Sequence, residues 1–355
     1  MRNPYENFPT EAFWRPAVGG INPLEIENLW TPKLSLNSTD KVVTAGSCFA
    51  QHIGKALTRV GFNWFDAEPG PGPAEINRKF NYGVFSFRTG NIYTVSLLRQ
   101  WIDWAFDPSL QSEEVWEKEG RFYDPFRPVI EPEGFASEAE LRSARDATLA
   151  AIRRAVTEAR VFVFTLGLTE CWTNKATGVA YPMCPGTTAG TFDPENHVFK
   201  NYRYDEIYND FVYVAEQMRK QNPDLQILLT VSPVPLTATA SGDHVLVSTT
   251  YSKSVLRAVA GDLKTSFPFI DYFPSYEIIT APVFRGMFFK PNAREVSLKG
   301  VDFVMTHFFA GLNLDSAPSR GQPAVQETAP QKPSTPPDDG DVVCEEAALE
   351  AFSQT

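Results

Sequence analysis

The sequence predicts an α/β fold in which a doubly wound, mainly parallel sheet lies between two layers of helices. Two observations predict this class. Apolar runs such as 161–166 and 226–231 lack the alternation of a half-exposed strand, as expected for parallel strands buried on both faces. Helical segments alternate with these runs along the chain. With 355 residues and 43% hydrophobic residues, the chain is large enough to bury such a core.

The first β–α unit is expected from a strand at 41–45 and a helix at 51–60. Residues 66–74 contain repeated proline and glycine and predict a loop. Two glycine-bearing segments follow, at 81–84 and 88–93. They lead towards the next helix and are candidates for a second functional loop.

That helix is expected at 94–105, and residues 106–136 after it are rich in proline and lack a clear period, which predicts an insertion. Ser137 and Glu140 form a capping box that opens a helix extending to about Arg160. Its apolar and small residues recur on one stripe, as on a helix that packs against a sheet.

The remaining elements repeat the alternation of helix and strand. Helices are expected at 204–220, 252–265 and 297–309, and strands at 161–166, 226–231 and 269–272. Residues 1–37 are irregular and aromatic and predict an N-terminal wrap around the α/β domain of residues 38–312.

Residues 313–355 predict a disordered, acidic tail, because they include six prolines between 318 and 337 and few bulky apolar residues. Within this tail, 341–352 has the spacing of a short amphipathic helix, using Val343, Ala347, Leu349 and Phe352. It is either a frayed terminus or a docking peptide for a protein partner.

Composition excludes several classes of function. The formal charge of −11 argues against general binding to nucleic acid or anionic membranes. The start of the chain does not resemble a signal peptide, and no apolar run has the length of a membrane span. The four cysteines lack paired or zinc-like spacing, so we expect reduced thiols, a cytoplasmic protein, and neither metal nor other cofactor.

The most informative motif is Gly46-Ser47-Cys48-Phe49-Ala50, where a buried strand breaks and a helix begins. Ligands and reacting groups gather at the carboxyl ends of strands in open α/β sheets, and a helix start offers free N–H groups. Ser47 is therefore a candidate nucleophile, with a helix N-cap as the alternative. Cys48 is a rival nucleophile but is expected to point into the core.

This motif resembles the signature of the GSCFA family, a branch related to the SGNH/GDSL hydrolases. Segments 165–172, 231–236, 252–257 and 272–277 resemble that family in the same order, over about residues 38–310. The resemblance implies a bacterial protein with a three-layer α/β/α fold and a serine esterase or acyltransferase activity based on Ser47.

The SGNH relationship also implies oxyanion donors. They would be the backbone N–H of Ser47 and a glycine N–H from the second loop, for which Gly83 and Gly90 compete, with Asn91 beside the latter. A third block would follow the strand at 161–166, where Gly167 is present and Thr169 replaces the usual asparagine. Each glycine could instead serve only a turn.

Glu170 follows Thr169, and it could orient a base, bind a sugar hydroxyl, act as a general base or form a strand-end ion pair. Trp172 could stack on a sugar or pack in the core. Lys253 and Arg257 lie four residues apart on one helix face, which could bind an anion or simply be solvated.

The general base is where the sequence departs from SGNH enzymes. Asn292 and Glu295 stand where the resemblance expects an aspartate and a histidine. Of the four histidines, His244 is the favoured replacement, because its loop follows a strand end on the side of Ser47. Glu170, Glu295 and His52 are the alternatives.

The sequence thus predicts an SGNH-like serine esterase or O-acyltransferase acting on acylated sugars or polysaccharide precursors. The resemblance, rather than any single residue, implies this substrate class. The absence of the usual Asp–His pair supports an alternative, a non-catalytic carbohydrate-binding or scaffold protein that retains the pocket.

Overall fold

The computed structural model describes residues 3–312 and 344–354 of the chain, and its centre is a parallel sheet. The strand order is β1-β4-β8-β9, formed by Val42–Gly46, Val161–Leu166, Gln226–Val231 and Ile270–Tyr272. β1 and β4 pair from Val42↔Val161 to Gly46↔Thr165, so their carboxyl ends lie side by side. Strands β1 and β4 are buried along their whole length, as their apolar sequences predict.

The sheet has a topological switch point at β1. On the side away from β4, Val42 pairs in parallel with Trp64, which comes soon after α1. The N–H of Val42 donates to the carbonyl of Asn63, and the N–H of Phe65 donates to the carbonyl of Val42. The chain therefore leaves β1 in one direction and later returns on the other side. In open α/β sheets, ligands bind at such points.

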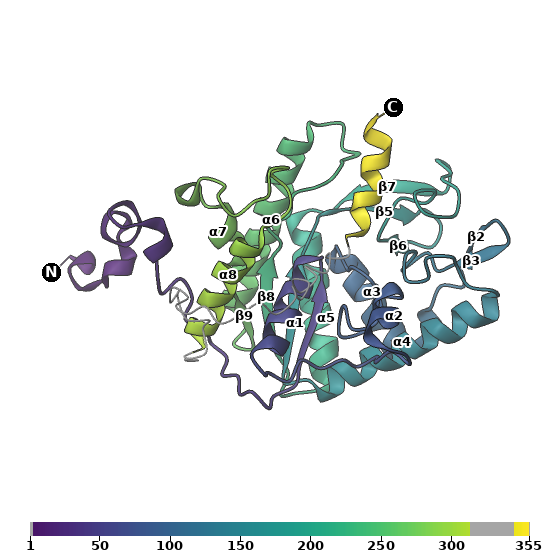
Figure 1. Ribbon diagram of the computed structural model, residues 1–355, viewed down its shortest axis with the longest axis horizontal. Helices are drawn as coiled ribbons and strands as arrows, with labels where there is room; N and C mark the ends of the chain where they lie inside the picture. The colour runs from purple at the N-terminus through teal and green to yellow at the C-terminus, as the bar shows by residue number, and fades with distance from the viewer. Residues whose placement is uncertain (1–2, 313–343, 355) are drawn as a thin grey trace, which may run out of the picture.

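Helices cover both faces of the sheet (Figure 1). One face packs against α3 (Val95–Phe106), α4 (Glu138–Glu158), α5 (Tyr204–Gln221) and α6 (Val245–Ser266). The other packs against α1 (Phe49–Arg59), α7 (Ser275–Thr280) and α8 (Leu298–Gly311). The predicted three-layer α/β/α fold is confirmed.

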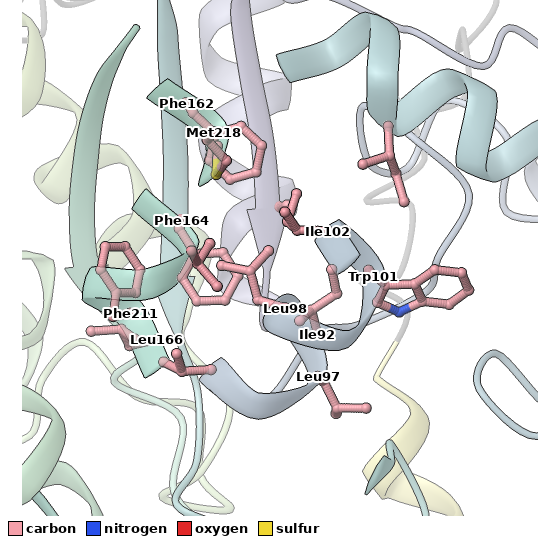
Figure 2. Close-up of a cluster of buried hydrophobic side chains, with 14 of the residues drawn as sticks. Ile92, Leu97, Leu98, Trp101, Ile102, Phe162, Phe164, Leu166, Phe211 and Met218 are labelled. Carbon is pink, nitrogen blue, oxygen red and sulfur yellow. The ribbon is translucent and has the colours of Figure 1, made fainter. Parts of the chain in front are cut away.

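Figure 2 shows the larger core, on the face covered by α3 to α6. Phe162, Phe164 and Leu166 alternate along β4 and point to this face, where Leu98 of α3 and Phe211 of α5 meet them. Because these side chains fix α3, they also fix the loop at 88–94 that leads into it. That loop carries part of the candidate site.

The sequence missed several short elements. α2 (Ala74–Lys79) follows the predicted loop, and the predicted insertion contains a hairpin of β2 (Trp116–Lys118) and β3 (Arg121–Tyr123). A second sheet, in the order β6-β5-β7, is formed by Ala180–Tyr181, Glu170–Asn174 and His197–Asn201. These strands are only two to five residues long, too short for a period to emerge.

The N-terminal segment consists of short turns of helix, and in Figure 1 it projects from the body of the molecule. Within the predicted N-terminal wrap, Trp30 is buried and stacks on Phe308, whereas Phe13 and Trp14 are exposed. The short helices of the chain are η1 (Pro4–Asn7), η2 (Thr10–Ala12), η3 (Arg15–Gly19), η4 (Pro23–Glu25), η5 (Pro108–Leu110), η6 (Pro282–Phe284) and η7 (Glu345–Gln354). No helix among the described residues is long and apolar enough to cross a membrane.

η7 lies within the predicted disordered tail. Residues 313–343, which include the proline-rich part, are outside the described residues. Glu345–Gln354 form a 3-10 helix, drawn in yellow beside β5 and β7 in Figure 1. The last part of the chain thus has regular structure and lies against the domain.

Candidate functional site

Gly46 sets the position of Ser47 at the end of β1. Its φ is +123°, and a Cβ added there would lie 2.4 Å from the carbonyl oxygen of Thr165 on β4. Only glycine combines this backbone conformation with so close an approach. The chain therefore turns sharply after β1, and Ser47 lies between the strand and α1.

Ser47 is buried, and its Oγ has no hydrogen-bond partner within the described part of the chain. The N-cap position of α1 belongs to Cys48, so the interpretation of Ser47 as an N-cap residue is wrong. A buried hydroxyl without a protein partner is costly, and this one lies at the carboxyl end of β1, where ligands and reacting groups gather in open α/β sheets. The backbone N–H of Ser47 donates to the carbonyl of Thr165 at 3.0 Å, so the expectation that it is a free oxyanion donor is also wrong.

The loop at 90–92 lies beside Ser47. The N–H of Ile92 donates to the carbonyl of Gly46 at 2.8 Å, which ties the loop to the end of β1. Asn91 is buried, and its N–H points at Glu345 Oε1, 3.4 Å away. The Asn91 side chain also hydrogen-bonds the Glu345 carboxyl group. Asn91 thus offers two donors that converge on one carboxyl group.

The structure separates the two glycines that competed for this loop. Gly83 lies in an exposed turn, where an added Cβ would meet nothing within 4 Å. At Gly90 an added Cβ would lie 2.3 Å from Glu345 Oε1. Gly90 therefore leaves room for a ligand group, whereas Gly83 serves only its turn.

The end of β4 closes the site from the other side. A Cβ added at Gly167 would lie 3.0 Å from Ser47 Cβ and 2.9 Å from the carbonyl oxygen of Tyr93. The N–H groups of Gly167 and Leu168 both donate to that carbonyl. Gly167 thus allows β4, Ser47 and the 90–93 loop to approach closely.

Lys253 of α6 reaches the backbone of Gly167 at the end of β4. Its side chain is buried, and its Nζ donates to the carbonyl of Gly167 at 2.7 Å. Burial lowers the pKa of Lys253 to about 8. The interpretation of Lys253 and Arg257 as one solvated face is wrong, since Arg257 is half-buried and pairs instead with Glu277.

Thr169 and Glu170 lie where β4 passes into β5. The N–H of Thr169 donates to Ser252 Oγ, and its own hydroxyl is buried. Glu170 is buried, and its Oε1 accepts a hydrogen bond from Thr239 Oγ1 at 2.9 Å. Burial raises the pKa of Glu170. Glu170 has no ion-pair partner among the described residues, so the predicted strand-end ion pair is wrong.

A cavity of about 660 Å³ opens beside Glu170. Its walls are mostly apolar, and Trp172 packs edge-on against Phe192 and Phe199 there. Other wall residues come from the loops of both sheets, including Leu168, Met183 and Leu236. The cavity has the size and character of a small-molecule pocket, with Glu170 as a polar group in its wall.

No histidine hydrogen-bonds Ser47 among the described residues. α6 begins at Val245, earlier than predicted, so that exposed His244 is its N-cap, and His244 Nδ1 accepts from the N–H of Leu246. His52 packs on Phe49. Burial lowers its pKa to about 4, and repulsion from Lys55 and Lys290 adds smaller shifts in the same direction. Ser47 Oγ hydrogen-bonds none of the described residues, these histidines included.

The segment of Asn292 and Glu295, where the SGNH resemblance would place an Asp–His pair, points away from Ser47. Glu295 is exposed and pairs with Lys290 at 2.7 Å, and Asn292 Nδ2 donates to the same carboxylate at 2.8 Å. These two residues hold their own loop together. Their neighbour Arg294 turns towards the site instead, where it lies 3.4 Å from the carboxylate of Glu346.

Sequence reasoning did not assign the C-terminal residues to this site. Glu345 and Glu346 are buried. Cys48 is buried, as expected, and its thiol hydrogen-bonds the Cys344 thiol. The only signal was the amphipathic spacing at 341–352, which was interpreted as a docking peptide or a frayed end. Its contacts are with the chain's own site.

A comparison with protein families identifies the family of the chain. Residues 41–308 match the GSCFA family, a span that includes Ser47, Asn91, Gly167 and Lys253. A search of curated proteins found no match. Because the matched span covers most of the chain, the protein belongs to the GSCFA family.

Proposed function

We propose that this protein is an SGNH-like serine esterase or O-acyltransferase that uses Ser47 as its nucleophile. The observation that carries the proposal is the buried Ser47 hydroxyl, which has no partner among the described residues, at the switch point of the sheet. It lies between the loop that carries Asn91 and Gly167, whose carbonyl accepts a hydrogen bond from the amine of Lys253. Acyl transfer by serine needs these three parts: a nucleophile, oxyanion donors and a base.

Lys253 is the proposed base in place of His244. Its pKa of about 8 leaves about a tenth of the amine neutral at pH 7, and a neutral amine can accept the Ser47 proton. Ser47 Oγ then attacks the ester carbonyl, and Asn91 stabilises the oxyanion. The leaving alkoxide takes the proton back from Lys253, and water or an acceptor hydroxyl later releases the acyl group with Lys253 again accepting its proton.

The cavity supports an acylated sugar or polysaccharide precursor as the substrate. Trp172 and Phe199 offer flat apolar walls for the C–H face of a sugar ring, and Glu170 offers an acceptor for a sugar hydroxyl. The surrounding aliphatic side chains suit an acyl group. The net charge of −11 supports a neutral rather than polyanionic substrate.

A fluorophosphonate probe followed by mass spectrometry tests the nucleophile. η7 lies in the site, so the probe is applied to the wild-type chain and to a Glu345→Ala variant. We expect an adduct on Ser47, none in Ser47→Ala, and a labelling rate in Lys253→Met lower by about 10² or more. Exposed Lys299 provides the control Lys299→Met, which should label at the wild-type rate.

Two results would contradict the proposal. If Ser47 is unlabelled in both the wild type and Glu345→Ala, it is not an activated nucleophile. That result would favour the alternative, a non-catalytic binding protein, which the lack of a histidine at Ser47 also supports. If Lys253→Met, shown to be folded by its circular dichroism spectrum, labels at the wild-type rate, Lys253 is not the base.

A further inference from the structure

The C-terminal segment Cys344 to Phe352 occupies the candidate site through side chains of different chemistry. Glu345 Oε1 receives the N–H of Asn91 and lies against the bare Cα of Gly90. This is the position that the proposed function gives to an oxyanion. The segment therefore places a carboxyl group at the donors that a reacting ester would need.

Glu346 fills a neighbouring position. Its side chain is buried, it pairs with Arg294, and its charge also acts on the pKa of Lys253. Its backbone N–H lies 3.4 Å from the hydroxyl oxygen of Tyr93. Two cations from different elements, Arg294 before α8 and Lys253 on α6, thus face the acidic pair.

The rest of the segment lines the cavity. Leu349 and Phe352 contribute to its wall, together with Trp172 of β5 and Phe199 of β7. Phe352 is nevertheless 60% exposed, while the two glutamates are buried. A segment that belonged to the core would bury its phenylalanine and expose its carboxylates. The observed pattern is that of a bound acidic peptide.

This binding carries a built-in cost. Across the described chain, Glu345 Oε2 has no hydrogen-bond partner although it is buried. A buried polar atom without a partner costs free energy, which makes docking easier to reverse. Because residues 313–343 join the segment to α8, it is always present near the site.

We propose that the candidate active site is a binding site for the chain's own acidic C-terminal segment. In this complex Asn91 donates a hydrogen bond to Glu345, and Arg294 forms an ion pair with Glu346. The bound segment excludes substrate and so lowers the activity. The binding stands on its own contacts, whereas the inhibition rests on the function proposed above. A competing role for Glu345 as the general base is disfavoured, because an anion at Asn91 would repel the developing oxyanion.

Disulfide formation between the native cysteines tests the binding and requires no activity assay. Cys48 and Cys344 are in contact, so oxidised glutathione should convert the full-length chain to a form with a Cys48–Cys344 disulfide, releasing two molecules of glutathione. Mass spectrometry of the monomer identifies the linked peptides. We expect Glu345→Ala to slow the linkage at least tenfold, and Glu350→Ala, on the exposed side of η7, to leave it unchanged. A linkage that forms equally fast in Glu345→Ala and the wild type, or a linkage only between two chains, would overturn the proposal.

The fluorophosphonate probe tests the inhibition on the same variants. Ser47 should react at least tenfold faster in Glu345→Ala than in the wild type or Glu350→Ala. Loss of labelling in Glu345→Ala alone would make Glu345 a catalytic base and overturn the inhibitory role. If the disulfide forms but Ser47 is unlabelled in every variant, the binding is supported and only the proposed function fails.

Discussion

Two glycines and one lysine determine what Ser47 can do. Gly46 allows the sharp turn after β1, and Gly167 allows β4 to approach Ser47 Cβ. Lys253 contributes an amine whose carbonyl partner belongs to Gly167 itself. The three residues come from three different elements, so the geometry of Ser47 depends on close backbone packing rather than on one flexible side chain.

Replacing Gly167 with alanine should impair both stability and Ser47 reactivity. The added methyl group would lie 2.9 Å from the carbonyl oxygen of Tyr93 and 3.0 Å from Ser47 Cβ, so one of them must move. We expect a loss of about 1–3 kcal/mol in the free energy of unfolding, measured in urea, and slower fluorophosphonate labelling. Gly19→Ala, whose methyl group would meet only contacts of 3.6 Å or more, is the control. Equal effects of the two substitutions would refute this role.

At the scale of elements, a buried ion cluster fastens the insertion to α4. Asp124, just after β3, accepts hydrogen bonds from Arg127 Nε at 2.8 Å and from Arg145 Nη2 of α4 at 2.9 Å. All three side chains are fully buried. Burial by itself would raise the pKa of Asp124, but Arg145 and Arg127 more than offset this and hold that pKa below its usual value. Arg145 also donates to the carbonyl of Ser112, which extends the cluster to the start of the insertion.

Asp124→Asn should be strongly destabilising, because it removes the anion that Arg127 and Arg145 share in the buried cluster. We expect the free energy of unfolding to fall by about 3–5 kcal/mol in urea denaturation. Asp302→Asn, which removes an exposed pair with Arg59 at 3.2 Å, should change it by about 1 kcal/mol or less. A similar small effect at both positions would mean that the cluster adds little to stability.

At the scale of the whole molecule, the two ends of the chain differ. The N-terminal segment projects with exposed aromatic residues such as Trp14 (Figure 1). The C-terminal segment returns to the carboxyl end of β1 and lies against the site. Burial raises the pKa of Glu345 from 4.5 to about 8 and that of Glu346 from 4.5 to about 7. Docking is therefore linked to the uptake of protons.

The sign of this linkage predicts a pH dependence. Because the pKa of Glu345 is higher when docked than in water, docking binds a proton between about pH 4.5 and 8 and weakens as pH rises through that window. The ratio of Ser47 labelling rates, Glu345→Ala over wild type, should fall towards one between pH 5 and 9. Taking the ratio cancels the titration of Lys253, which acts in both chains. The groups that face Glu345 are Asn91, Tyr93, Cys344 and Glu346.

The size of this pH effect on the labelling-rate ratio is bounded. One proton can change the ratio by at most about tenfold per pH unit, and Glu346 adds to the effect in both chains. A ratio that stays constant from pH 5 to 9 would show that docking does not involve protonation of Glu345.

The sequence by itself determined the three-layer fold and the place of Ser47. Long buried strands and amphipathic helices have periods that depend only on neighbouring residues, and a Gly-Ser break between them marks a strand end wherever it occurs. Gly90, Asn91 and Gly167 also stood among the candidates, because each follows from a local motif.

Only the tertiary structure decided which side chains meet at Ser47. Lys253 and Arg294 carry no local mark of their burial, and Cys344 to Glu346 are separated from Ser47 by almost 300 residues of sequence. His244 was favoured from its loop, but α6 begins seven residues earlier than its pattern indicated and takes His244 as its N-cap. Periodicity reports the face of a helix, whereas the partner of a buried charge depends on how distant elements pack, and that information is not local.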